Sequence, residues 1–227
     1  MTDRLAKLRR ASWLFFDMGA TLLDERYAIA DLFGQLVRVA SERGLRVSEE
    51  DVARAFQTAR TRYEPSWLAG AVNVLLEKDD DRAFILDAVE YRADLDEPYP
   101  DAVPVLSRLA GRYNIGVIAN QPPGSDERLK RHGLSPFVSL CLPSAEVGIA
   151  KPDPAIFRLA LERAQCEPGV AVMIGDRIDN DIRPARQLGW GTIRVRQGLA
   201  ASQVPRDALD EADLTVSTLS EISDILA

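Results

Sequence analysis

Two carboxylates stand directly after short apolar runs of the kind that form buried strands. Asp17 follows the aromatic-rich run Trp13–Phe16, and Asp176 follows the run Val170–Gly175. The carboxyl ends of the strands in an open parallel sheet face the crevice where ligands bind, so both side chains are predicted to serve one site. Taken alone, Asp17 would equally suit a turn or a helix cap, because Asp is common in both.

These residue types permit phosphoryl transfer. Such a site needs a nucleophile, a cation that neutralises the phosphoryl oxygens, a fixed positive charge and a proton donor for the leaving group. Asp17 can be the nucleophile and form an aspartyl-phosphate. Asp176 and Asp181 suit Mg²⁺, which binds one or two carboxylates and keeps several waters. Lys151, which opens the segment KPDP, is the candidate fixed charge, although on its own it would be interpreted as a surface lysine before a helix.

Outside one central segment, the sequence alternates between apolar strands and amphipathic helices. The predicted strands are 13–16, 113–119, 137–142, 170–175 and 192–195, with an edge strand at 214–216. The predicted helices are 101–111, 125–132, 153–164, 181–188 and 219–226, after a helical or frayed arm at 1–11. This alternation predicts an α/β fold with a Rossmann-like parallel sheet covered by helices.

The alternation stops between about residue 25 and residue 97, where four apolar stripes follow one another at helical spacing. The stripes are 29–40, 48–59, 67–76 and 83–91. Ser48 and Asp51 form a capping-box pattern, and the last two stripes are separated by Asp79–Asp81, which are predicted to be solvated. A helical insert between the first strand and the rest of a parallel sheet is a candidate lid that excludes water and selects substrates. The predicted domains are therefore a core of residues 1–24 and 98–227 and a helical cap of residues 25–97.

Four segments of the chain resemble, in their order and separations, the four motifs of the haloacid dehalogenase superfamily. They are FFDMGATLLD, IGVIAN, KPDP and VAVMIGDRIDND. The resemblance covers most of the chain and implies a phosphatase-like hydrolase with a helical cap of the first type. It implies that Asp17, Asp176 and the backbone carbonyl of Gly19 bind Mg²⁺ directly, with Asp181 acting through water. It also implies that Lys151 contacts both Asp17 and the phosphoryl group.

Two positions depart from the phosphatase pattern. Phosphatases of this superfamily carry a second Asp two residues after the nucleophile, which protonates the leaving oxygen and later activates water, but this chain has Gly19 there. Such a group contributes ~10²–10⁴-fold in rate, so we expect a slow phosphatase or a leaving group that needs no proton. Ala119 stands where a hydroxyl usually binds the phosphoryl group, a loss on the order of 1 kcal/mol for which Asn120 could partly compensate.

The same departures leave other functions open. All the charged positions are kept, which fits a protein that binds Mg²⁺ and a small anionic ligand or a protein partner without turning it over. Dehalogenase-like or phosphonatase-like cleavage would also need no acid at Gly19. The acidic segment GDRIDND, however, favours the metal-dependent branch, and Lys78, the only lysine in 25–97, lies in a charged run where it is expected to be solvated.

Composition excludes several classes of function. The 227 residues are 46% hydrophobic and 28% charged with a formal net charge of −7, which disfavours a surface for nucleic acid. No apolar run approaches the ~20 residues that span a bilayer, and the basic N-terminal residues precede a run too short for a signal peptide. Cys141 and Cys166 are expected to be reduced. The predicted protein is therefore cytoplasmic, and its predicted partner is a small phosphorylated or other anionic metabolite.

Overall fold

The computed structural model describes residues 2–226, so the outermost residues of the predicted core, 1 and 227, lie outside it. Within it the chain divides into two compact units. One is formed by the residues up to Asp24 together with those from Glu97 onward, and the other by Glu25–Asp96. Among the described residues, no helix is both long enough and apolar enough to cross a membrane.

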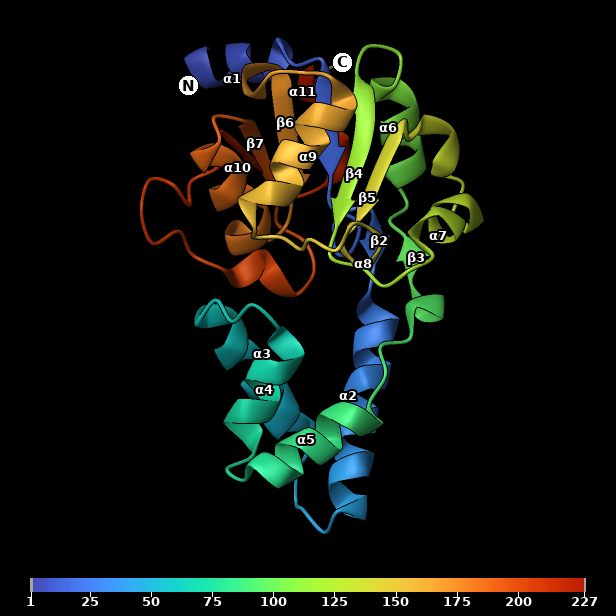
Figure 1. Cartoon of the computed structure of the whole chain (residues 1–227), viewed down its shortest axis with the longest axis vertical. Helices are drawn as coiled ribbons and strands as arrows, with labels where there is room; N and C mark the ends of the chain where they lie inside the picture. The colour runs from blue at the N-terminus through green and yellow to red at the C-terminus, as the bar shows by residue number, and fades with distance from the viewer. Residues whose placement is uncertain (1, 227) are drawn as a thin grey trace. The chain divides into compact units, whose positions relative to one another are not determined.

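The first unit is built on a six-stranded sheet of order β5-β4-β1-β6-β7-β8 (Figure 1). Its strands are β1 (Trp13–Phe16), β4 (Asn114–Ala119), β5 (Leu140–Pro143), β6 (Ala171–Gly175), β7 (Gly191–Val195) and β8 (Leu214–Val216). Every neighbouring pair runs parallel, which confirms the predicted Rossmann-like sheet. β5 begins later than predicted, because a turn of 3-10 helix, Ser135–Phe137, takes the start of that segment.

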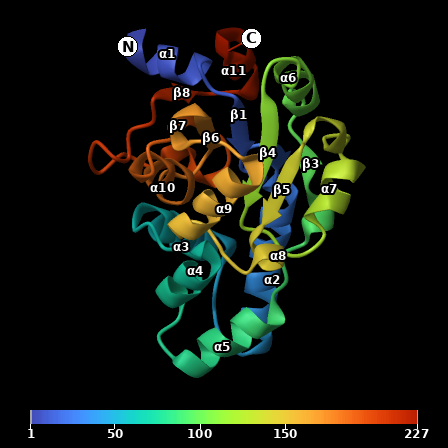
Figure 2. The ribbon, with the colours of Figure 1, turned by 45° about the horizontal axis from the view of Figure 1, so that its top comes forward.

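Alternating side chains along β1 separate two hydrophobic cores, because successive residues of a strand point to opposite faces. Leu14 and Phe16 pack on one side of the sheet and Phe15 on the other. The first side is covered by α1 (Thr2–Arg9), α6 (Ala102–Leu109), α7 (Ser125–Arg131) and α11 (Leu219–Leu226), and the second by α9 (Pro154–Ala164) and α10 (Arg183–Gln187) (Figure 2). β1 is thus buried on both faces and its end is held firmly in place.

The second unit is built on four α-helices with apolar faces that pack on one another, followed by a turn of 3-10 helix, Ala93–Leu95. The four α-helices are α2 (Arg26–Glu42), α3 (Glu49–Thr61), α4 (Trp67–Leu75) and α5 (Asp79–Ala88). The predicted capping box of Ser48 and Asp51 is present at the start of α3. The predicted solvated run Asp79–Asp81 forms the first turn of α5, and Asp79 and Asp80 are exposed there. Carboxylates are favourable there, because the first N–H groups of a helix lack backbone partners.

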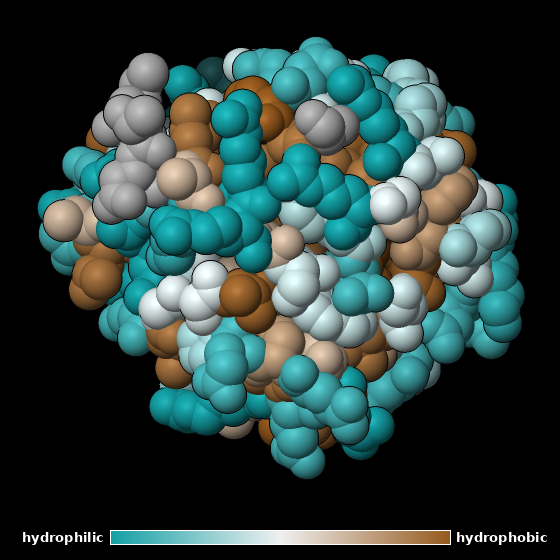
Figure 3. Space-filling view, turned by 90° about the horizontal axis from the view of Figure 1, so that it is seen from above, coloured by the Kyte–Doolittle hydropathy of each residue, from teal (hydrophilic) through white to brown (hydrophobic). Residues whose placement is uncertain are grey.

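The chain leaves and re-enters the first unit through a short pair of antiparallel strands. β2 (Leu23–Asp24) pairs with β3 (Glu97–Pro98), and the Tyr99 amide donates to the Leu22 carbonyl at 3.0 Å. Seen from above, hydrophilic side chains cover most of the visible surface, and hydrophobic ones are scattered among them (Figure 3).

A buried carboxylate anchors the segment between β7 and β8. Asp210 is 1% exposed and accepts hydrogen bonds from Arg183 Nη1 at 2.8 Å and from Arg206 Nε at 2.6 Å. Burial opposes its charge, but the hydrogen bonds from Arg206 and Arg183 outweigh burial and lower the pKa of Asp210 to about 2. The ionised carboxylate therefore stabilises the folded chain.

We expect Asp210→Asn to lower the free energy of unfolding by about 2 kcal/mol at pH 7, since one unit of pKa shift corresponds to about 1.4 kcal/mol. A group whose pKa is depressed on folding stabilises the protein above its unfolded pKa, here 3.8, and ceases to do so as the pH falls toward 2. Urea unfolding of wild type and variant between pH 7 and pH 3 should show the difference shrinking below about pH 4.

Asp207→Asn is the matched control for this experiment. Asp207 also binds Arg183, at 2.9 Å, but its side chain is 51% exposed. An exposed ion pair contributes at most about 1 kcal/mol, so this variant should change the unfolding free energy little. A loss in Asp210→Asn that stays constant with pH would contradict an origin in the charge of the carboxylate.

Candidate active site

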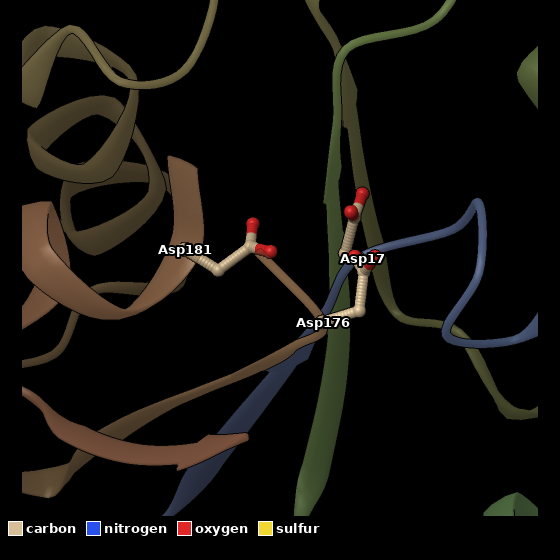
Figure 4. Close-up of side chains that lie close together, drawn as sticks. All are labelled: Asp17, Asp176 and Asp181. Atoms are coloured by element: carbon tan, nitrogen blue, oxygen red, sulfur yellow. The ribbon is translucent and has the colours of Figure 1, made fainter. Parts of the chain in front are cut away.

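The predicted carboxylates meet at the carboxyl ends of two adjacent strands. Asp17 directly follows β1, and Asp176 directly follows β6, the parallel neighbour of β1. Asp181 lies in the π-helical turn Ile178–Ile182 that comes next. One oxygen from each of the three carboxylates lies within 4.8 Å of the others, and Figure 4 shows Asp181 facing the other two from its turn. All three residues are buried.

Lys151 completes this cluster from the segment before α9. Its Nζ lies 2.9 Å from Asp17 Oδ1 and 2.6 Å from Asp181 Oδ1, and its side chain is 1% exposed. Burial opposes the charge of the ammonium, but the Asp17 and Asp181 carboxylates outweigh burial and raise the pKa of Lys151. Lys151 is therefore a fixed positive charge at neutral pH.

Asn120 positions Lys151 through the backbone. Its side-chain nitrogen donates to the Lys151 carbonyl, and its side-chain oxygen accepts from the Lys151 amide, both at 2.7 Å. The predicted contact of this side chain with substrate stays a prediction; its oxygen and its nitrogen each bind the Lys151 backbone. Ala119, the other predicted substrate-binding residue, is fully buried at the end of β4 and offers no side-chain hydrogen bond.

Asp181 depends on a glycine for its position. Its Oδ2 accepts from the Arg177 amide at 3.0 Å, and burial raises the pKa of Asp181 to about 7, although the ion pair with Lys151 opposes the shift. A Cβ at Gly175 would lie 2.7 Å from the Asp181 Cβ and would overlap its carboxyl group. The residue before Asp176 must therefore be glycine for Asp181 to lie against the strand end.

We expect Gly175→Ala to weaken divalent-metal binding by about 10–100-fold, the usual cost of disturbing the groups that support a metal site. The added methyl group would displace the Asp181 carboxylate from the cluster. Calorimetric titration with Mg²⁺ measures the change. Gly169→Ala is the control, because a Cβ there meets nothing within 4 Å. Unchanged Mg²⁺ affinity in Gly175→Ala would show that the position of Asp181 is irrelevant to metal binding.

The donor set fits a divalent cation. Three carboxylates and one ammonium leave two formal negative charges, which one divalent ion would balance. Carboxylate and carbonyl oxygens are the ligands that Mg²⁺ prefers. Gly19, whose carbonyl is the fourth predicted ligand, lies in the buried turn after Asp17, where the Met18 carbonyl accepts the amide of Leu22 at 2.9 Å.

A turn after β7 that the sequence analysis missed holds the Asp176–Asp181 loop. The turn is the 3-10 helix Leu199–Ser202, followed by buried Gln203. The Gln203 side chain donates to Asp179 Oδ1 at 3.0 Å and accepts from the Ile178 amide at 2.9 Å. Nothing in the sequence marks Gln203, because an amide side chain in a loop is usually solvated.

Arg194 ties the same turn to the end of β6. Its Nη2 donates to the Ala200 carbonyl at 2.8 Å, and its Nε donates to the Asp176 carbonyl at 3.4 Å. The residue is buried at the end of β7, a strand whose five residues are all buried. A charged residue in an otherwise apolar strand requires hydrogen-bond partners, so the position of Arg194 in the sequence could have indicated that it holds a neighbouring loop.

Comparisons with known proteins place the chain among hydrolases of one family. The haloacid dehalogenase-like hydrolase family model matches residues 12–189. A glyceraldehyde 3-phosphate phosphatase of Methanopyrus kandleri is 29% identical over 224 residues, which are 94% of this chain and 96% of that protein. A pyrimidine 5'-nucleotidase of Escherichia coli is 29% identical over 197 residues, 79% and 84% of the two chains. The fold matches the crystal structure of a predicted phosphoglycolate phosphatase from Haemophilus somnus with a TM-score of 0.73, at 18% identity over 96% and 99% of the two chains.

Proposed function

Because the chain belongs to the haloacid dehalogenase-like hydrolase family, we propose that it hydrolyses a small phosphate monoester through an aspartyl-phosphate on Asp17. The observation that carries the proposal is the 2.9 Å contact between Lys151 Nζ and Asp17 inside a buried cluster of carboxylates. An ammonium in this position keeps the nucleophile ionised and offsets its repulsion from an anionic phosphoryl group.

The contacts of Asp17 indicate which oxygen attacks. Oδ1 accepts from the Met18 amide at 2.7 Å and lies 2.9 Å from Lys151 Nζ, which leaves Oδ2 as the attacking atom. Attack on phosphorus breaks the bond to the leaving oxygen and forms the aspartyl-phosphate. Water then attacks the same phosphorus, so phosphate is released and the carboxylate is restored.

Mg²⁺ is the proposed cofactor of this site. Asp17, Asp176, Asp181 and the Gly19 carbonyl would hold the ion, which when bound neutralises charge on the phosphoryl oxygens. Lys151 supplies the remaining positive charge, and Asn120 keeps the lysine in place through its two backbone contacts.

The substrate proposed is a small phosphorylated metabolite, as the names of the two similar enzymes suggest for their own reactions. Residues 25–96 are proposed to act as a substrate-selecting cap, since the chain enters and leaves them through β2 and β3, directly after the turn that follows Asp17. Lys78 does not favour phosphonatase chemistry, because it is exposed before α5, where an ammonium stays hydrated.

Phosphate release from a panel of phosphate monoesters, with Mg²⁺ and with EDTA, tests the proposed function. We expect release that requires Mg²⁺. A second function, binding without turnover, is favoured by Gly19 and Ala119, the two positions that lack the usual acid and hydroxyl. Saturable binding of an ester, seen by calorimetry, with no release from any member of the panel would contradict hydrolysis and support that second function.

A further inference from the structure

We propose that the site is specialised for phosphates whose leaving group departs without a proton, namely acyl, enol and aryl phosphates, and that it disfavours alkyl phosphates. This inference rests on the proposed function, because it takes Asp17 as the nucleophile. Three sets of residues around Asp17 in the first unit carry it: the charged cluster, the turn after β1 and the loop after β4.

The side chains of the charged cluster bind one another. Lys151 Nζ is held between Asp17 and Asp181 at 2.9 and 2.6 Å, and the two Asp181 oxygens accept from Lys151 and from the Arg177 amide, so both side chains are engaged inside the cluster. Asp176 and Asp181 are needed as anions if the cluster is to hold a divalent ion. The ionisable groups of the cluster therefore balance the charges of one another and of the ion.

The turn after β1 supplies no acid either. Gly19 has no side chain, and its neighbours Met18 and Ala20 are apolar and buried. Thr21 is fully buried, and a hydroxyl group is too weak an acid to protonate a leaving oxygen at neutral pH. The residues that follow the nucleophile are therefore unable to donate a proton to a leaving group.

The polar side chains of the loop after β4 likewise bind other residues of the protein. The Asn120 side chain binds Lys151, and Gln121 Oε1 accepts from Arg128 Nη1 at 2.5 Å. The single histidine of the chain, His132, lies after the last residue of α7, about 10 Å from the start of that helix at a rise of about 1.5 Å per residue. Its imidazole is therefore placed away from the loop that approaches the site.

Without a proton donor, the site requires a leaving group that is stable as an anion. When Asp17 attacks an acyl or aryl phosphate, the P–O bond breaks and the electron pair stays on a carboxylate or phenolate, which is stable without a proton. An alkoxide is far more basic than either, so an alkyl phosphate needs a donor at this step. An acyl phosphate has a further advantage, since transfer to Asp17 exchanges one mixed anhydride for another.

The second half of the reaction lacks a base for the same reason. Water attacks phosphorus, the bond to Asp17 breaks with its electron pair returning to the carboxylate, and the water proton passes to bulk solvent. The side chains of the cluster, of the turn after β1 and of the loop after β4 offer no base that is free to take that proton during attack. Breakdown of the aspartyl-phosphate is therefore slow, and the phosphoenzyme accumulates with acyl phosphates.

The test compares kcat/KM for acetyl phosphate, p-nitrophenyl phosphate and glycerol 3-phosphate in wild type, Gly19→Asp and Gly19→Ala. We expect the wild type to prefer the first two over glycerol 3-phosphate by at least about 10³-fold. Gly19→Asp should raise the ratio of kcat/KM for glycerol 3-phosphate to kcat/KM for acetyl phosphate by about 10²–10⁴-fold. Gly19→Ala adds a Cβ without an acid and should keep the preference of the wild type.

A measurement on the wild type alone keeps the inference testable if Gly19→Asp does not fold. With p-nitrophenyl phosphate, we expect a solvent deuterium isotope effect on kcat/KM close to 1, because no proton moves in the first step. An effect of about 2, or a rate with glycerol 3-phosphate within tenfold of that with p-nitrophenyl phosphate, would overturn the inference and leave the proposed function standing. If none of the three compounds releases phosphate, the proposed function itself fails.

Discussion

Asp17→Asn should reduce phosphate release by at least about 10⁴-fold, the scale on which a lost nucleophile lowers kcat in enzymes that form covalent intermediates. An amide cannot form the aspartyl-phosphate, so neither the transfer of the phosphoryl group to residue 17 nor its later hydrolysis can occur. The fold should persist, because Asp181 still pairs with Lys151 at 2.6 Å, and removing one of three adjacent carboxylates relieves repulsion. We therefore expect an inactive variant with an unchanged or raised Tm.

The measurement is phosphate release from p-nitrophenyl phosphate with Mg²⁺, together with trapping of the labelled phosphoenzyme. Asp224→Asn is the matched control, since it removes one negative charge from an ion pair with Arg108 whose Asp224 side chain is 70% exposed. It should retain activity within about twofold. Substantial turnover by Asp17→Asn, with a phosphoenzyme still formed, would show that another residue is the nucleophile.

Lys151→Met should lower both activity and stability. Removing one preorganised charge from a site of this kind costs about 10²–10³-fold in kcat. The variant also leaves fully buried Asp181 without its ion-pair partner, a change that typically costs about 3–5 kcal/mol of unfolding free energy. The pKa of Lys151 is raised on folding, so its contribution is fully present below its ordinary value of 10.5 and is lost only at higher pH.

The double variant Lys151→Met with Asp181→Asn separates the two effects. Stability should recover in the double variant, because the buried carboxylate is gone, whereas activity should stay low, since the charge beside Asp17 is still missing. Lys130→Met, at an exposed lysine on α7, is the control and should alter neither quantity. If Lys151→Met keeps full activity, the ammonium plays no part in phosphoryl transfer.

Much of the core and of its charged site was predictable from the sequence because the signals are local. A short apolar run with a carboxylate directly after it predicted the ends of β1 and β6, and alternation with amphipathic helices predicted parallel strands. Asp153 with Pro154 correctly predicted the start of α9, where the Asp153 side chain accepts from the Ala155 amide at 2.8 Å. Periodicity and capping depend on residues within a few positions of one another, so one sequence is enough to detect them.

Local signals failed where two patterns competed. The three aspartates before the last stripe of the second unit are predicted only as a solvated run, and the sequence did not indicate that they form the first turn of α5. The same composition suits a solvated loop and a helix N-terminus, because both favour exposed carboxylates. Which of the two occurs depends on where the helix packs.

By itself, then, the sequence determined the parallel sheet and the carboxylates at its strand ends, since each is a property of residue type and local order. Only the tertiary structure decided that Asn120 binds Lys151 and that Gly175 makes room for Asp181. It alone also decided that Arg194 and Gln203 hold the loop that bears Asp176. These contacts join residues from different elements, and they exist only once the elements have packed at one particular distance and register.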